Sequence, residues 1–372
     1  MIPMSASHQP IRILEVTSRY PPFIGGVENH VYQVSRRLVQ KGMDITVLTT
    51  DPEHRLPHEE VREGVKIQRV RAWPREKDFY FAPEIYGKIR AGGWDIVHVQ
   101  CYHTLVPPVA MWAAWRSGIP YVVTFHGGGH SSAVRGTLRG VQRQMLRPFL
   151  NHAERLVAVA QFEIPLYGRE LHIPSDRFCL IPNGADLPHP LKSNTVQNQG
   201  TLIVSMGRLE RYKGHQLVIR AMPKLIELIP DIHLWIAGNG LYEPKLRKLV
   251  HKLGLESRVD IHAVPSPERE RMAKELSAAT LVVLLSEFET HPISILEAIS
   301  LGKPALVTDT SGLRELADKG WARSIALGSS PQQIAAAVVE QIKHPQTPGA
   351  FRLPTWDECA SSLLDLYQDV VR

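Results

Sequence analysis

The chain has 372 residues and a formal net charge of +6, with 44% of its residues hydrophobic and 22% charged. This composition excludes an intrinsically disordered chain, and the length predicts two domains of about 150–200 residues each. The basic balance fits either scattered surface charge or an anionic partner such as a nucleotide, nucleic acid or acidic membrane, and net charge alone does not choose among them.

The cysteines and the N-terminal residues bear on the compartment. Cys101, Cys179 and Cys359 are far apart and show no CxxC spacing, which argues against a disulfide framework or a zinc site and favours a reducing environment. Residues 1–10 lack the charged start and apolar core of a signal peptide. No run reaches the ~18 apolar residues of a membrane-spanning helix, so we expect a cytoplasmic protein.

The first half of the chain alternates between expected strands and helices. Residues 11–16 (IRILEV) are typical of a buried strand, and apolar residues at helical spacing predict an amphipathic helix over residues 27–40. Residues 44–50 (DITVLTT) predict the next strand, which makes this region a βαβ unit and implies a parallel sheet. The pattern continues with strands at 66–70, 95–100, 121–129, 155–160 and 179–186 and helices at 109–118 and 133–153.

A polar stretch, residues 191–200, is expected to be a linker, and the alternation starts again beyond it. The second half predicts strands at 201–209, 233–240, 259–264, 280–286 and 304–309 and helices at 216–228, 244–252, 267–277 and 292–300. Residues 355–372 carry apolar residues at helical spacing and predict a closing helix. We therefore expect an N-terminal domain over residues 1–192 and a C-terminal domain over residues 200–354.

Candidate ligand contacts in the first half follow expected strands, where doubly wound domains bind their ligands. Gly25 and Gly26 precede a helix, where glycine lets a ligand approach the backbone and the helix N-terminus offers N–H groups to an anion. The spacing is not GxGxxG, and a simple tight turn is the alternative. His126 ends a strand and precedes three glycines, which suits substrate contact as well as a structural role.

The second half contributes two further loops. Arg208 and Lys213, in GRLERYKGH, suit a diphosphate, because arginine can bind it bidentately while lysine supplies a point charge. Without the other motifs, Arg208 and Lys213 would be interpreted as ordinary charged residues on the protein surface. Gly238, Asn239 and Gly240 form another glycine-rich turn after a strand, where a nucleobase or ribose could approach.

Two glutamates flank the start of the helix expected at 292–300. Pro292 suits the first helical position, and the positive end of the helix dipole would point at the cleft between the domains. Glu289 could accept hydrogen bonds from sugar hydroxyls, and Glu297 could bind a ribose diol. The alternative is a solvated carboxylate at 289 and a helix-face glutamate at 297, whose charge, flanked by apolar residues, would need a partner.

In this order, the motifs resemble the retaining glycosyltransferases of family GT4, which have the GT-B fold. The resemblance covers almost the whole chain and rests on PPFIGGVENHV, DIVHVQ, TFHG, IPNGAD, GRLERYKG, IAGNG and the Glu-x7-Glu pattern ETHPISILE. It implies an α/β fold of two Rossmann-like, doubly wound domains facing each other across a cleft, with the closing helix, residues 355–372, packed back on the N-terminal domain. It also implies that no metal or other cofactor is needed.

The resemblance implies a role for each motif. Gly25 and Gly26 would contact the donor phosphate or the acceptor, and His126 would lie beside the transferred sugar. The catalytic set would be His126, Arg208, Lys213 and Glu289, with the two cations on the diphosphate and Glu289 on the donor sugar. Further donor-binding residues would be Gly238, Asn239, Gly240, Pro292, Ile293, Ser294 and Glu297, the last on the ribose.

We therefore expect an enzyme that moves a hexosyl group from a UDP- or GDP-linked sugar to a lipid-linked or saccharide acceptor, in glycolipid, cell-envelope or exopolysaccharide synthesis. Two alternatives stay open, namely a nucleotide-sugar 2-epimerase of the same fold and an inactive scaffold subunit that binds sugar nucleotides. Nucleic acid is not expected as a partner, because no aromatic platforms are interleaved with the basic residues.

A basic stripe occupies the helix expected at 133–153. It consists of Arg135, Arg139, Arg143 and Arg147 at i, i+4 spacing, with an apolar stripe nearby. In GT-B enzymes that act on lipid-linked acceptors, this part of the N-terminal domain often faces the bilayer. One expectation is peripheral contact with anionic membrane on its cytoplasmic face, and the other is a solvated arginine face.

Overall fold

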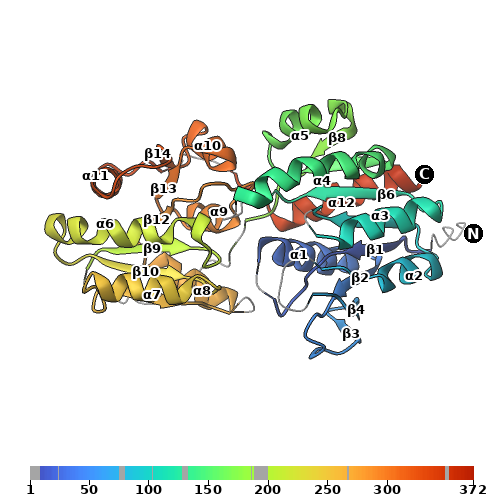
Figure 1. The fold of residues 1–372 in the computed structure, drawn as a ribbon, viewed down its shortest axis with the longest axis horizontal. Coiled ribbons are helices and arrows are strands. Elements are labelled where there is room, and N and C mark those ends of the chain that lie inside the picture. Colours follow the sequence, from blue (N-terminus) through green and yellow to red (C-terminus); the bar gives the residue numbers. More distant parts are fainter. Residues whose placement is uncertain are drawn as a thin grey trace, which may run out of the picture.

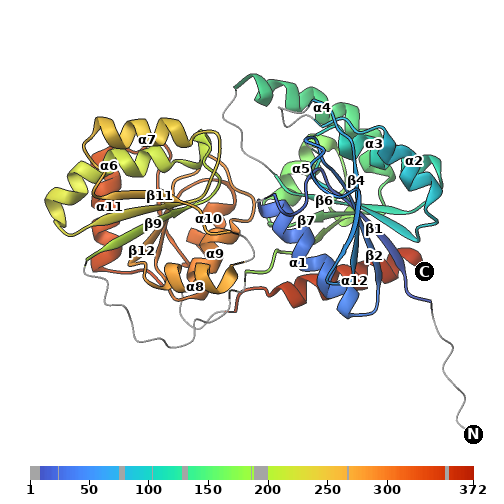
Figure 2. The same cartoon turned by 90° about the horizontal axis from the view of Figure 1, so that it is seen from below.

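The computed structural model describes residues 9–372 with gaps at 24, 75–79, 103, 128–132, 186, 188–199, 266–267 and 348–351, and it describes no side chains for residues 133–141 and 143. These residues form two α/β domains that lie side by side, each built around its own sheet (Figure 1). Turning the molecule shows helices on both faces of each sheet (Figure 2).

The N-terminal domain contains a mostly parallel sheet. Its strands are β1 (Arg12–Val16), β2 (Asp44–Thr50), β3 (Glu59–Arg62), β4 (Val65–Val70), β5 (Ile96–Gln100), β6 (Tyr121–Phe125), β7 (Arg155–Ala158) and β8 (Phe178–Leu180). They lie in the order β3-β4-β2-β1-β5-β6-β7-β8, and β3 pairs antiparallel with β4. The helices are α1 (Gly26–Gln40), α2 (Glu84–Ala91), α3 (Val106–Arg116), α4 (Ala133–His152) and α5 (Glu163–Leu171).

The C-terminal domain contains a parallel sheet in the order β11-β10-β9-β12-β13-β14. These strands are β9 (Leu202–Met206), β10 (His233–Ala237), β11 (Val259–His262), β12 (Leu281–Leu284), β13 (Ala305–Thr308) and β14 (Arg323–Ile325). The helices of this domain are α6 (His215–Leu228), α7 (Glu243–Lys252), α8 (Arg269–Ser277), α9 (Ile293–Ser300), α10 (Ser311–Asp318) and α11 (Pro331–Lys343).

The central strands are nearly continuous runs of apolar residues, because helices cover both faces of each sheet. Every residue of β5, β6 and β12 is buried. Helix α1, in contrast, packs an apolar stripe against the core through Val31, Val34 and Leu38. The chain turns away after α1 at Gly42, whose φ of +87° lies in the region that favours glycine.

The last helix, α12 (Trp356–Val371), belongs to the N-terminal domain and packs against α1. It starts with a capping box, in which Thr355 and Glu358 satisfy each other's backbone N–H groups. Trp356 and Tyr367 are almost fully buried in the core that α1 shares. Gly184 permits this packing, because a Cβ there would lie 2.2 Å from the backbone nitrogen of Trp356.

The expectation of two Rossmann-like α/β domains is confirmed, and individual elements differ in detail. The helix expected at 292–300 begins one residue later, because Pro292 has a ψ of 83° and acts as the N-cap. Its carbonyl accepts the N–H groups of Ile295 and Leu296. Helices α2, α5, α10 and α11 and strands β3 and β14 were not anticipated. Of the expected linker, residues 191–199 lie outside the described residues.

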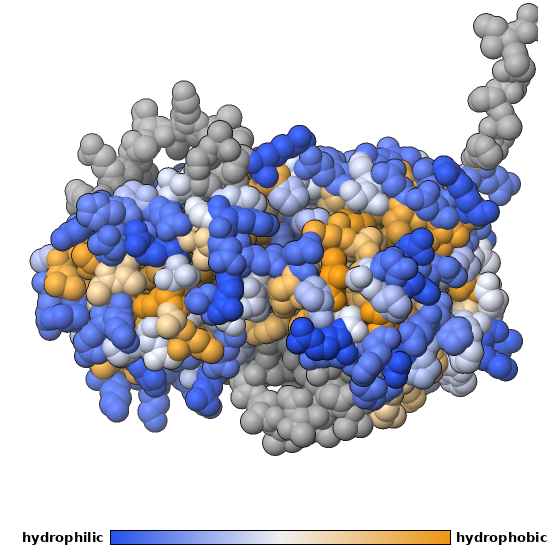
Figure 3. Space-filling view, turned by 90° about the horizontal axis from the view of Figure 1, so that it is seen from above, coloured by the Kyte–Doolittle hydropathy of each residue, from blue (hydrophilic) through white to orange (hydrophobic). Residues whose placement is uncertain are grey.

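The surface is mixed in character. On the face shown in Figure 3, hydrophilic side chains predominate and apolar patches interrupt them on both domains. Within the described parts of the chain, each helix is too short or too polar to cross a membrane.

Candidate active site

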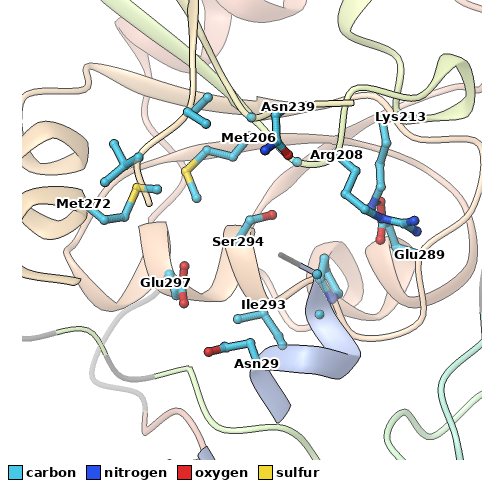
Figure 4. Close-up of a pocket in the computed structure, with 18 of the residues that line it drawn as sticks. Asn29, Met206, Arg208, Lys213, Asn239, Met272, Glu289, Ile293, Ser294 and Glu297 are labelled. Atoms are coloured by element: carbon cyan, nitrogen blue, oxygen red, sulfur yellow. Dashed lines mark hydrogen bonds and ion pairs between the residues drawn. The ribbon is translucent and has the colours of Figure 1, made fainter. Parts of the chain in front are cut away.

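A cavity that is open to solvent lies between the two domains. On the N-terminal side it is bounded by Gly25, Gly26 and Asn29 at the start of α1. On the other side it is bounded by the segments that follow β9, β10, β11 and β12 and by the first turn of α9 (Figure 4). The site therefore lies where parallel strands end, as the doubly wound architecture predicts.

The start of α1 presents backbone to this cavity. A Cβ added at Gly26 would meet no atom within 4 Å, whereas one at Gly25 would lie 2.2 Å from the carboxylate of Glu28. The N-cap, Gly25, offers no side chain to the first N–H groups of the helix. A ligand can therefore approach the positive end of α1 at Gly26 without meeting a side chain there.

Lys213 and Glu289 form an ion pair on the C-terminal side. The lysine Nζ lies 2.5 Å from Oε1 of Glu289, and both side chains are only 13% and 11% exposed. Ser286 Oγ donates to the same oxygen at 2.6 Å, and the backbone N–H of Glu289 donates to Ser311 Oγ. Burial alone would lower the pKa of Lys213, but the adjacent Glu289 carboxylate outweighs it and the pKa lies above its usual value. The lysine is therefore a fixed positive charge.

Arg208 supplies a second cation beside this pair, and Figure 4 shows the two cationic side chains pointing toward the same region as Glu289. Its guanidinium lies 2.7 Å from Oε1 of Glu210 and donates to the Tyr212 hydroxyl at 3.1 Å. Burial alone would lower the pKa of Arg208, but Tyr212 and Glu210 outweigh this effect. The pKa of Arg208 therefore lies above its usual value. Arg208 and Lys213 thus place two permanent positive charges on one wall of the cavity.

Glu297 lies deeper on α9 and is 4% exposed. Its Oε1 is paired with the guanidinium of Arg269, at the start of α8. This is the partner that a buried carboxylate requires. Arg269 was not among the expected site residues. It lies in a segment of alternating charges, SPERERMAKEL, which is typical of a solvent-exposed helix surface. The methionines Met206 and Met272 line the same part of the cavity with apolar surface (Figure 4).

His126 is close to the cavity but is not one of its lining residues. It follows β6, is 8% exposed, and its Nε2 lies 2.8 Å from Oε1 of Gln100. Its ring is 4.8 Å from that of His30 on α1. The next carbonyl, that of Gly127, accepts a hydrogen bond from Thr290 Oγ1 at 2.5 Å, which links the two domains beside the site.

The structure brings most of the expected site residues together. The lining residues among them are Gly25, Gly26, Arg208, Lys213, Gly238, Asn239, Glu289, Pro292, Ile293, Ser294 and Glu297. Gly240 is not among the lining residues and packs against Leu209, where a Cβ would lie 2.6 Å from the carbonyl oxygen. Ala263, Asn29 and His291 also line the cavity, and burial lowers the pKa of His291 to about 3, so its ring is neutral at physiological pH.

The expected basic stripe falls mostly outside the described side chains. The side chains of Arg135, Arg139 and Arg143 lie outside the described residues. Arg147 is half-buried, and its Nε has no hydrogen-bond partner among the described residues. Within the described residues, no group of three or more His, Cys, Asp or Glu side chains is arranged to hold a metal ion.

Two Rossmann-like domains with a cavity between them have the architecture of the GT-B fold. The chain belongs to the family-4 and group-1 glycosyltransferases. Residues 24–188 match the model of Glycosyltransferase Family 4, and residues 191–352 match that of Glycosyl transferases group 1. These matches confirm the family expected from the motifs and establish the protein as a transferase of glycosyl groups from nucleotide sugars.

Two relatives illustrate the family. D-inositol 3-phosphate glycosyltransferase of Nocardiopsis dassonvillei is 26% identical, and the match covers 92% of this chain and 89% of that protein. GDP-mannose:cellobiosyl-diphosphopolyprenol alpha-mannosyltransferase of Xanthomonas campestris is 25% identical over 80% of this chain and 79% of its own. The alternative activities, a 2-epimerase or an inactive scaffold, find no support in these relatives.

Solved structures share the fold. Sucrose-phosphate synthase from Thermosynechococcus elongatus superposes with a TM-score of 0.78 at 19% identity, covering 97% of this chain and 99% of its own. HepE of Anabaena, in complex with UDP-glucose, gives a TM-score of 0.70 at 19% identity and 96% coverage of both chains.

Proposed function

We propose that this protein is a retaining hexosyltransferase that uses a UDP- or GDP-linked sugar and a lipid-linked or saccharide acceptor, in glycolipid, cell-envelope or exopolysaccharide synthesis. The observation that carries the proposal is the juxtaposition of Arg208, Lys213 and Glu289 on one wall of the interdomain cavity, opposite the open backbone at Gly26. This arrangement suits a nucleotide sugar, because such a substrate carries a negatively charged diphosphate in the middle and a sugar with several hydroxyl groups at one end.

The cations would bind the diphosphate. Lys213 would stabilise the negative charge that builds up as the sugar–phosphate bond breaks, since its charge is fixed and already positioned by Glu289. Arg208 would grip a second phosphate oxygen. The N–H groups at the start of α1 would add donors from the opposite domain, so the diphosphate would be held between the two domains.

The carboxylates would bind the two ends of the donor. Glu289 is held by Lys213 and Ser286 through Oε1, which leaves its other oxygen to accept a sugar hydroxyl. Glu297, with Arg269 beside it, would accept the ribose diol. Gly238 and Asn239 would border the nucleoside, and His126 would contact a hydroxyl of the transferred sugar.

The proposed retention of configuration would not use Glu289 as the nucleophile. A carboxylate 2.5 Å from a lysine and 2.6 Å from a serine hydroxyl is a weak nucleophile, because its charge is already satisfied. The acceptor would instead attack from the face that the diphosphate leaves, and the departing phosphate would take the acceptor's proton. No metal would be required, because Arg208 and Lys213 would neutralise the diphosphate.

A lipid-linked acceptor would be reached through the outer face of α3 and α4. Trp112 and Trp115 of α3 are 46% and 45% exposed, and Trp115 contacts the side chain of His152 on α4 at a ring distance of 4.6 Å. Tryptophan beside basic residues is typical of surfaces at the membrane interface. Replacing all four stripe arginines with glutamine should weaken sedimentation with anionic liposomes, and unchanged sedimentation would remove this part of the proposal.

The test of the activity is a panel of nucleotide sugars incubated with the purified protein and EDTA, with release of UDP or GDP as the readout. We expect slow hydrolysis of one donor, which Glu289→Gln abolishes. Glu287→Gln is the matched control, because Glu287 is exposed and lies outside the cavity. If no donor is hydrolysed and none raises the melting temperature, the proposed donor site is wrong.

A further inference from the structure

The turn formed by Glu289 and Thr290 is packed between two glycines from opposite domains. On its own side, a Cβ added at Gly312 would lie 1.8 Å from the carbonyl oxygen of Thr290. On the other side, a Cβ added at Gly127 would lie 2.6 Å from Oγ1 of Thr290. Neither position has room for a side chain, so the backbone of both domains approaches this turn as closely as only glycine permits.

Helix α10 holds the backbone of Glu289 at both of its polar groups. The N–H of Glu289 donates to Oγ of Ser311 at 2.9 Å, and its carbonyl accepts the N–H of Gly312 at 2.9 Å. Ser311 has a φ of +46°, a conformation that costs free energy in a residue with a side chain. The Glu289 turn and the start of α10 therefore form one unit, and a movement of α10 moves Glu289 with it.

This unit is joined to the N-terminal domain at two points, because α10 lies on the side of its domain that faces the other one (Figure 1 and Figure 2). Thr290 is 6% exposed, and its Oγ1 donates to the carbonyl of Gly127 at 2.5 Å. Further along α10, Oε1 of Glu315 accepts the backbone N–H of Phe162 at 2.6 Å. The ring of Phe162 also meets that of Phe288 edge to face, at 6.0 Å. The two hydrogen bonds form the domain junction.

The N-terminal side of the domain junction is held together by Glu163, which is fully buried. Its Oε2 accepts the backbone N–H groups of Val159 and Ala160 at 2.9 and 3.3 Å. Its Oε1 accepts that of Gly127 at 3.4 Å. Because Glu163 directly follows Phe162, one carboxylate connects the loop after β6 with the loop after β7. Both hydrogen bonds of the junction thus join one tied segment of each domain.

We infer that Thr290 and Glu315 are positioning residues, which fasten the Glu289 turn to the N-terminal domain so that Glu289 is held at the donor sugar only while the domain junction is made. The role in turnover rests on the proposed function, whereas the coupling of the two hydrogen bonds does not. Two segments that meet at two points separate together, so loss of one bond should weaken the other. Arg208 and Lys213 belong to the C-terminal domain alone, so binding of the diphosphate should change little.

The coupling is measured by amide hydrogen exchange, resolved residue by residue on the whole protein. The amide of Phe162 reports the domain junction, because an N–H at the start of a helix has no partner within α5 and exchanges once Glu315 moves away. Thr290→Val removes the hydroxyl group and keeps the size of the side chain. We expect exchange at Phe162 to become about 10-fold faster in this variant, as loss of one hydrogen bond implies, although Thr290 bonds to a different residue.

Further variants make the exchange test specific. Thr290→Ser keeps the hydroxyl group and should exchange like wild type. Thr310→Val removes a hydrogen bond that stays within the C-terminal domain, to the carbonyl of Glu287 at 3.3 Å, and should also leave exchange at Phe162 unchanged. If Thr290→Val does not fold, Gly127→Ala tests the same contact from the other domain, because its methyl group would push Thr290 away.

Turnover of the donor is measured on the same variants. Thr290→Val and Glu315→Ala should each lower kcat about 10-fold with little change in the KM for the donor. Together they should lower kcat little more than either alone, because both break the same junction. Thr290→Ser and Glu315→Gln, which keep the hydroxyl group and the acceptor oxygen, should retain most of kcat.

The exchange and the kinetics fail in distinguishable ways. Unchanged exchange at Phe162 in Thr290→Val would overturn the inference, because the two hydrogen bonds would then act separately. Faster exchange with an unchanged kcat would overturn the role of the domain junction in placing Glu289, while the proposed transferase would stand. If the wild-type protein turns over no donor, the proposed function fails, and the exchange result still decides whether the two hydrogen bonds are coupled.

Discussion

The two domains supply polar groups to the site in opposite ways. The C-terminal domain places charged groups at the cavity wall, on the loops and helices that follow its strands, as in the Lys213–Glu289 and Arg269–Glu297 pairs. The N-terminal domain buries a carboxylate within its sheet, at Glu15, and presents the backbone of Gly25 and Gly26 and the side chain of Asn29 to the cavity.

This difference corresponds to what each side would bind. A diphosphate needs strong, fixed charge, and ion pairs near the surface of a cavity provide it. Sugar and acceptor hydroxyls are neutral, so neutral donors and acceptors of hydrogen bonds are sufficient to bind them. The charge at Glu15 lies within the sheet, away from the residues that line the cavity. If this division holds, changes in the two domains should differ in the kind and the size of their effects.

The largest effect is expected on the stability of the N-terminal domain. Trp356→Ala should lower the free energy of unfolding by about 3–5 kcal/mol, since it empties a fully buried site that α12 shares with α1. Denaturant unfolding measures this change. Trp321→Ala, at a half-buried position of the C-terminal domain, is the control, and an equal loss from both variants would show that α12 is not essential to the core.

Acid should destabilise the protein through its buried neutral histidines. Burial lowers the pKa of His30 to about 4 from the usual 6.5, so the unfolded state takes up a proton at a pH where the folded state does not. Stability should therefore fall as the pH drops from about 6.5 to 4, by up to about 3 kcal/mol for this group.

The pH dependence is measured as the unfolding free energy across that range in wild type and in His30→Leu. The variant should show a shallower slope, and His215 and His291, whose pKa values burial also lowers to about 4 and about 3, should contribute to the slope that remains. A slope unchanged by His30→Leu would mean that His30 is not buried in its neutral form.

Removal of either partner of the central ion pair should affect turnover more than stability. Lys213→Ala and Glu289→Gln should each lower kcat at least ~10²-fold, or about 2.7 kcal/mol, because charge stabilisation of the leaving group is lost. Arg211→Ala is the control for the lysine, because Arg211 is exposed two residues away. Near-normal rates in both site variants would contradict the assignment of the diphosphate site.

The smallest effect is expected at Arg269. Arg269→Met should raise the KM for the donor about 10-fold with little change in kcat, because Glu297 would lose the partner that holds it for the ribose. Steady-state kinetics separate the two constants. Arg271→Met, on the exposed side of the same helix, should change neither. A fall in kcat at constant KM would place Arg269 at the reacting centre instead.

The fold and much of the site were predictable from the sequence for a physical reason. Parallel strands buried on both faces leave long apolar runs, and ligand-binding residues follow those runs, as Arg208 and Glu289 do. Arg269 was not predictable, because its role depends on which face of α8 meets α9. Glu15 left a visible signal, a carboxylate inside IRILEV, but its partners come from β5 and α12, and only the sheet order brings them together.

The position of α12 has a consequence for how the chain is made. The first domain to be synthesised lacks Trp356, Leu363 and Tyr367 until α12 has left the ribosome. The C-terminal domain is therefore complete before the N-terminal one, the reverse of the usual order for two-domain chains. A chain that stops before α12 would therefore lack part of the core of its first domain rather than of its second.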